Sequence, residues 1–276
     1  MDTVAAASVA SLPPRDKIAI FSALGGVSAL SWAYLVVMAR DMAAMDMPAV
    51  GMAAAVPGPM GQAGQMMAIQ SWSPAHFGMM LLMWVVMMIG MMVPTAVPMT
   101  LVYAAVVRKA GRQGTPIAPT AMFVLGYVVV WSLFSLAATL VQWGLDEAAL
   151  LSPMMVSTSP LLGCGLLIGA GIYQLTPMKG ACLEHCRAPA HFFAAHWRPG
   201  AFGAFAMGSH HGAFCLGCCW ILMGLLFLGG VMNLLWIALI TAFVLVEKVL
   251  PFGARGGQLV GLLMILAGGS GLAGFL

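Results

Sequence analysis

Long apolar runs that are almost free of charge constrain this chain more than any other feature. Only 7% of its 276 residues are charged, whereas soluble domains carry about 25% charged residues. A bilayer offers no hydrogen-bond partner to the backbone, so runs of about 20 apolar residues cross it as helices. The sequence therefore predicts an all-α, polytopic transmembrane bundle. The predicted spans are 18–39, 76–107, 118–143, 161–176, 203–229, 231–247 and 258–276.

Six spans are the alternative to seven, because the first and last runs have the weakest pattern. The first run is longer than the apolar core of a signal peptide, although a cleaved signal is the other interpretation. Residues 1–17 are predicted to form a short disordered tail, and residues 18–276 a single transmembrane domain. Two loops are predicted inside that domain, a methionine-rich loop at 40–73 and a Cys/His loop at 177–200.

The basic residues indicate an orientation. Of the 11 Lys and Arg residues, all except Arg40 fall before the first span or in alternate loops. Short loops rich in Lys and Arg stay in the cytoplasm. We therefore expect a cytoplasmic N-terminus, an external 40–73 loop and a cytoplasmic 177–200 loop.

One predicted span, 203–229, contains many side chains that can bind metals. It carries two histidines and three cysteines: His210, His211, Cys215, Cys218 and Cys219. At a rotation of about 100° per residue, one sector of about 80° contains Met207, His211, Cys215 and Cys218. Imidazole and thiol groups inside a membrane are costly unless they are partnered or used. This stripe predicts a buried metal site, unless the cysteines are small apolar core residues and the histidines are hydrogen-bonded.

A second stripe lies on the predicted helix 76–107. One histidine and five methionines share a sector of about 120°. They are His76, Met79, Met80, Met83, Met87 and Met91, whereas Met88 and Met92 point the other way. Methionine is also an adaptable packing residue, so each of them alone is explained by helix contacts. Together they predict a face that lines a path for a metal ion.

A third group of ligands, Cys182, His185 and Cys186, lies in the predicted cytoplasmic loop. Thioether and thiolate ligands select soft ions such as Cu(I), whereas carboxylates and water suit hard ions. Zinc would use Cys and His but leaves most of the 25 methionines unexplained. The expected bound ion is therefore Cu(I), with zinc as the weaker alternative.

Three segments resemble a bacterial family of predicted metal-binding integral membrane proteins. The run MLLMWVVMMIGMMVPTAVPM is similar to the family's Met-rich helix, and YQLTPMKGACLEHCRAP and GAFAMGSHHGAFCLGCCWILM are similar to its second half. The similarity extends from about residue 72 to residue 250. It implies a multi-pass protein of the bacterial cytoplasmic (inner) membrane that binds metal through His211, Cys215, Cys218 and Cys219.

Three functions fit these features. The first is copper handling, as a transporter or as a chaperone that delivers Cu(I) to a membrane cuproenzyme. Its predicted ligands change from neutral Met outside to Cys and His at depth, which favours inward transfer or retention. The second is an accessory or structural subunit of a larger membrane enzyme complex, with no bound metal.

The third is a thiol redox enzyme that uses Cys182 and Cys186, or Cys215 and Cys218, as a reversible dithiol pair. No nucleic-acid-binding motif, P-loop or dinucleotide fingerprint is present, and no catalytic residues can be assigned. The expected partners are the lipid bilayer and a membrane cuproenzyme or a larger membrane complex.

Overall fold

The computed structural model describes residues 9–53, 72–110, 117–152, 155–250 and 253–274, and only the backbone of 42–53, 110 and 117–118. The described chain is helical apart from turns and an isolated β-bridge, which confirms the predicted all-α class. The helices are α2 (Pro14–Ala53), α4 (Pro74–Ala110), α5 (Ile117–Glu147), α6 (Pro160–Leu175), α7 (Pro177–Arg187), α8 (Pro189–His196), α9 (Gly200–Gly224), α10 (Leu226–Gly229), α11 (Leu234–Val249) and α12 (Gly253–Ala273).

Local start signals fix several helix boundaries. Ser159, Thr176 and Asn233 each accept a hydrogen bond from a backbone N–H in the first turn of α6, α7 and α11, respectively. Proline follows the first two caps directly, at a position where its missing N–H has no helical partner in any case. Because Thr176 ends α6 and starts α7, the chain bends there by 64°.

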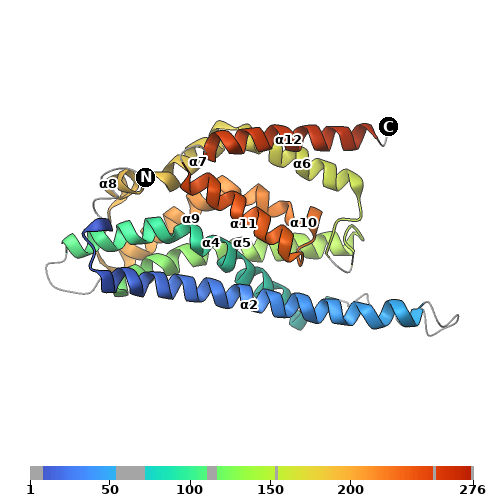
Figure 1. Ribbon diagram of the computed structural model, residues 1–276, viewed down its shortest axis with the longest axis horizontal. Coiled ribbons are helices and arrows are strands. Elements are labelled where there is room, and N and C mark those ends of the chain that lie inside the picture. The colour runs from blue at the N-terminus through green and yellow to red at the C-terminus, as the bar shows by residue number, and fades with distance from the viewer. Residues whose placement is uncertain (1–8, 54–71, 111–116, 153–154, 251–252, 275–276) are drawn as a thin grey trace.

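The helices lie side by side, and the chain alternates in direction along the bundle (Figure 1). Helices α2, α5, α9 and α12 run away from the end that carries α7 and α8, and α4, α6 and α11 run back toward it. Basic side chains meet at this end. Arg108 forms an ion pair with Asp16, and Arg187 donates a hydrogen bond to the Leu250 carbonyl at 2.7 Å. The predicted cytoplasmic location of this basic end stays a prediction.

Five of the described helical segments are long and apolar enough to span a membrane. They are Pro14–Asp41, Pro74–Lys109, Pro119–Glu147, Gly200–Gly229 and Gly253–Ala273. The bent pair of α6 and α7 is a sixth candidate. The predicted spans at 161–176 and 231–247 do form helices, but α11 has 16 residues and is about 24 Å long, short of a hydrocarbon core of about 30 Å.

Three segments that were predicted to be irregular contain helices in their described parts. In the predicted tail 1–17, α2 has already begun at Pro14, and Asp16 is buried against α4. The predicted loop 40–73 is helical as far as Ala53, because Ala and Met favour helices enough to outweigh the scattered Gly and Pro; residues 54–71 of it lie outside the described residues. The predicted loop 177–200 consists mostly of α7 and α8, since its prolines start helices there.

Glycines bring α5 and α9 into direct backbone contact. A Cβ atom at Gly208 would lie 1.9 Å from the Phe123 carbonyl oxygen, and one at Gly126 would lie 2.1 Å from the Phe205 carbonyl oxygen. Such close approach is typical of small residues in membrane helix pairs. This contact fixes which face of α9 turns toward the centre of the bundle.

Candidate metal centre

Cys215 of α9 is the centre of a buried polar network. Its side chain is 1% exposed. The ammonium group of Lys248, on α11, donates to the Cys215 sulfur at 2.8 Å, and the Tyr127 hydroxyl, on α5, lies 3.0 Å from the same sulfur. Three helices that are distant in sequence therefore meet at one thiol.

The α4 backbone completes this network. The hydroxyls of Tyr127 and Thr95 both donate to the Met92 carbonyl, at 3.0 and 2.8 Å. The Lys248 ammonium also donates to the Thr95 hydroxyl, at 3.3 Å. The Tyr127 and Thr95 hydroxyls and the Lys248 ammonium group are thus all paired in one network with Cys215.

Lys248, Tyr127 and Thr95 were not predicted as site residues. The sequence pattern assigned Lys248 only to a basic loop that reports topology. Its position at the end of an apolar run, directly after Glu247, was a usable signal, because ionisable residues inside a membrane segment mark functional sites by default. Tyr127 and Thr95 carry no such signal in the sequence.

Four further cysteines surround Cys215. The thiols of Cys218 and Cys219 are buried and each donates to the Cys215 carbonyl at 3.0 Å. On α7, the Cys186 thiol interacts with those of Cys215 and Cys218. The Cys182 thiol lies 2.8 Å from the Cβ position of Gly217, which only glycine leaves free. The predicted cytoplasmic group and the predicted buried group are therefore parts of one sulfur cluster.

This cluster does not have the geometry of a closed metal site. Within the described parts of the chain, no three His, Cys, Asp or Glu side chains are arranged so that they could hold one metal ion. Two causes are visible at Cys215. The thiols of Cys218 and Cys219 point back to their own helix, and the Lys248 ammonium lies against the Cys215 sulfur. The cation beside the buried thiol is an ammonium group in this structure.

His211 is the second unusual group. Its side chain is 3% exposed, and its Nδ1 atom has no hydrogen-bond partner among the described residues. The ring stacks beside that of Tyr127, with the centroids 5.5 Å apart. Buried polar atoms without a partner are rare, and each requires an explanation. A free imidazole nitrogen one helical turn from Cys215 is suited to ligate a soft or borderline metal ion.

The methionine face of α4 is defined by Met80, Met83, Met87 and Met91. All four are buried in one cluster with the cysteines of α9. The helical rotation alone turned Met88 and Met92 away from this face, but both are also fully buried, because α4 is covered on all sides. The sulfur of Met92 lies 4.0 Å from that of Cys219, so a methionine outside the predicted set lies directly beside the cysteines.

The other predicted ligands lie at the two ends of the bundle. His76 packs against Trp72 at the start of α4, with ring centroids 4.9 Å apart. His185 stacks on Phe214 at 4.1 Å, and His210 lies beside His196 at 4.6 Å. The structure therefore brings His185 and His210 together near α8 and separates His76 from the cysteines.

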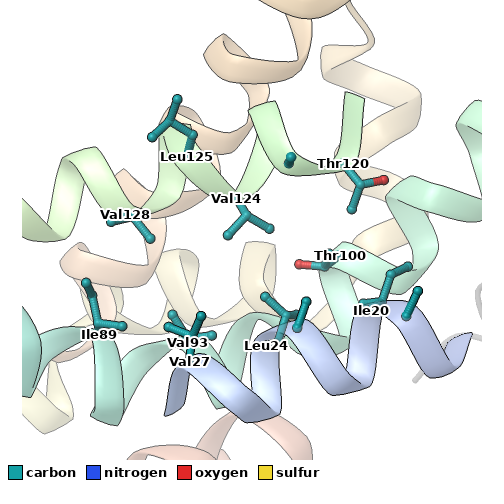
Figure 2. A pocket seen from close by; sticks show the side chains of 13 residues that line it. Ile20, Leu24, Val27, Ile89, Val93, Thr100, Thr120, Val124, Leu125 and Val128 are labelled. Atoms are coloured by element: carbon teal, nitrogen blue, oxygen red, sulfur yellow. The ribbon is translucent and has the colours of Figure 1, made fainter. Parts of the chain in front are cut away.

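A cavity of about 420 Å³ among α2, α4 and α5 supplies no metal ligand (Figure 2). Aliphatic side chains such as Leu24, Val93 and Val124 surround it, and its polar lining consists of Thr100 and Thr120. It contains no His, Cys or Met. The candidate metal centre is therefore the sulfur cluster on the other side of α4 and α5.

Comparison with known proteins agrees with this chemistry. Neither the curated proteins nor the solved structures contain a match to the chain. A family model named PpoB2, described as a copper chaperone, matches residues 81–270, which include α5, α6, α7, α8, α9, α10 and α11 and most of α4 and α12. The match covers more than half of the chain and contains every residue of the sulfur cluster. The chain belongs to this copper chaperone family.

Proposed function

We propose that this protein is an integral membrane copper chaperone that holds Cu(I) in the sulfur cluster and delivers it to a membrane cuproenzyme. The ligands are His211, Cys215 and either Cys218 or Cys219. The observation that carries the proposal is the pairing of a buried thiol with a buried ammonium group, beside an imidazole nitrogen that has no partner in the described parts of the chain. Family membership supports copper as the metal.

The charge of the Lys248 ammonium favours a monovalent ion. A buried thiolate is stable only with a cation beside it, because an isolated charge in a low-dielectric interior is very costly. If Cu(I) takes the place of the ammonium at Cys215, one positive charge replaces another. When the second cysteine ligand is also a thiolate, Cu(I) and the ammonium group, which stays nearby on Thr95, balance the two negative charges, whereas Zn(II) would leave one positive charge in excess. The site thus suits Cu(I) better than zinc.

Binding needs only side-chain rotations. The thiols of Cys218 and Cys219 have to leave the Cys215 carbonyl, and Lys248 has a second acceptor in Thr95. Thiolates select Cu(I), and the thioether of Met92 lies close enough to add a neutral ligand. The methionine face of α4 then serves as a set of weaker, uncharged sites along the same core.

The orientation belongs to the same proposal. We infer that the basic end of the bundle, with α7 and α8, lies in the cytoplasm of a bacterial inner membrane, because short basic loops stay on that side. Copper would then pass inward from the methionine face of α4 to the cysteines. Reporter fusions at 54–71 and at the C-terminus test this orientation, and an external reporter signal at both positions is the expected result.

The ligand assignment is tested by copper content. The double variant C215S/C218S, purified in detergent and loaded with Cu(I), should lose the tightly bound ion, because serine hydroxyls are poor ligands for it. The matched control is C164S, since Cys164 is also buried but lies on α6 beside Gly271. Unchanged copper in the double variant would favour a structural role for the cysteines in a larger membrane complex.

A further inference from the structure

A second cavity lies between α8 and the start of α9, at the basic end of the bundle. Its volume is about 330 Å³, which is large enough for a small ligand. The lining residues that can interact with a ligand are His196, Arg198, Met207 and His210. Two imidazoles, one thioether and one guanidinium therefore surround a space that the proposed deep site does not use.

The two imidazoles can act on one ion. Their rings lie edge to face, with centroids 4.6 Å apart. The Nδ1 atom of His196 is 3.1 Å from the Phe192 carbonyl oxygen, so when it donates to that oxygen the lone pair of Nε2 is left free. Metal-bound histidines are usually oriented by such a bond from the other ring nitrogen. His210 is exposed at this site.

The cavity is connected to the deep site by α9 itself. Met207, His211 and Cys215 follow one another at intervals of four residues, so they lie on one face at steps of about 6 Å. Met207 and Cys215 are both buried, and His211 between them has the nitrogen without a partner. These three side chains therefore form a row of possible copper ligands that leads from the cavity to the sulfur cluster.

We propose that this cavity is a Cu(I) exchange site, in which His196 and His210 take the ion from a small thiolate carrier and pass it to His211 by way of Met207. This inference rests on the proposed function, because it assumes that the sulfur cluster is the destination. It names the substrate as an anionic Cu(I)–thiolate complex of low molecular weight.

Arg198 is the reason for an anionic complex. Its guanidinium group repels a bare cation but attracts a complex in which two thiolates give Cu(I) a net negative charge. In the transfer, two copper–sulfur bonds break and two copper–nitrogen bonds form. Both thiolates leave with their electron pairs, copper stays Cu(I), and no oxidant or reductant is needed.

The test compares loading rates with final copper content. The protein, reconstituted in lipid nanodiscs, is mixed with Cu(I)–glutathione, and the rise of the near-ultraviolet copper–thiolate absorbance of the deep site is followed by stopped flow. The variant H196Q/H210Q should fill the deep site to the wild-type level, but more slowly by on the order of tenfold, as for loss of a group that supports a metal site. H191Q is the matched control, because His191 is an exposed residue of α8 that does not line the cavity.

The role of Arg198 has its own test. R198Q should slow loading from Cu(I)–glutathione but not from the cationic Cu(I)–acetonitrile complex. Wild-type rates in H196Q/H210Q with both donors would overturn the proposal. The proposal would also be overturned if H196Q/H210Q lost the binding of inorganic phosphate while its rate of copper loading stayed unchanged. The cavity would then be an anion site.

The test separates this inference from the proposed function. If wild-type protein does not fill the deep site with either donor, the proposed function fails. If it fills and C215S/C218S does not, while H196Q/H210Q fills at the wild-type rate, only the exchange site fails. Unchanged elution of each variant in size-exclusion chromatography shows that the protein has remained folded.

Discussion

The methionine face of α4 and the cysteine face of α9, which consists of Cys215, Cys218 and Cys219, lie in one buried core. They differ in the polar groups that contact their sulfur atoms. Met83, Met87 and Met91 are fully buried, and no described residue makes a polar contact with their sulfurs. Cys215 instead has an ammonium group and a phenol hydroxyl within 3.0 Å of its sulfur. The sulfur of Met80, the fourth residue of the methionine face, accepts a hydrogen bond from the uncharged Gln142 amide at 3.6 Å. A charged group thus contacts the sulfur of Cys215, whereas the methionine sulfurs have apolar or uncharged surroundings.

The difference follows from charge. A thioether is neutral whether or not it binds an ion, so it can be buried among apolar groups without compensation. A thiol that becomes a thiolate has to be balanced, and burial of an unpaired charge is very costly. In the proposed function, Lys248 keeps the charge of the cysteine face balanced when copper is absent. The predictions below test this contrast, in order of expected effect.

Replacement of Lys248 by Met should have the largest effect. Loss of one partner from a buried ion pair leaves the other charge unbalanced, which costs about 3 kcal/mol or more. We expect the metal-free variant to unfold at a lower denaturant concentration in detergent, and Cu(I) to restore much of its stability. Lys109→Met is the control, because Lys109 is exposed at the end of α4. Equal stability of the two variants would mean that Cys215 is a neutral thiol.

Replacement of Gly208 by Ala should have the second largest effect, because it displaces the whole cysteine face of α9. The added Cβ would lie 1.9 Å from the Phe123 carbonyl oxygen, so α5 and α9 have to separate. Overpacking of this kind costs about 1–3 kcal/mol. On α4, Gly78→Ala meets nothing within 4 Å and should not lower the unfolding midpoint, because Ala is also the better helix former. A stable Gly208 variant with normal copper content would show that the face tolerates displacement.

Replacement of His211 by Leu should change stability and binding in opposite directions. Removal of a buried nitrogen without a partner should raise the free energy of unfolding of the metal-free protein by about 1 kcal/mol. The same change removes a proposed ligand, so the Cu(I) affinity, measured by competition with a chelator, should fall. Tight binding at the wild-type level would exclude His211 from the ligand set.

Replacement of Met87 by Leu should have the smallest effect. The two side chains have similar volumes, and such swaps cost less than about 1.5 kcal/mol. We expect the copper in the deep site to be unchanged, and a weaker Cu(I) binding event in isothermal titration to be reduced. The exposed Met79→Leu on the same helix is the control. Loss of the tightly bound ion in the Met87 variant would make the methionine face part of the deep site.

Regions that were predicted as loops show where local patterns were insufficient. Residues 40–53 and 177–200 were predicted to lie in loops, but 40–53 continues α2, and in 177–200 Pro177 and Pro189 start α7 and α8 instead of breaking them. The position of each proline relative to a capping residue, as in Thr176–Pro177, was the informative detail. Recognition of that detail would have placed Cys182 and Cys186 on a helix that can pack against α9.

The sequence by itself determined the helical class, the soft character of the ligands and the stripe on α9, because these depend on composition and on the spacing of residues within one helix. Only the tertiary structure decided that Lys248 and Tyr127, 33 and 88 residues from Cys215, would meet at its sulfur. A helix that is apolar on all sides gives no signal of which face turns inward. That rotation is set by contacts such as Gly208 with Phe123, which exist only after the helices have packed.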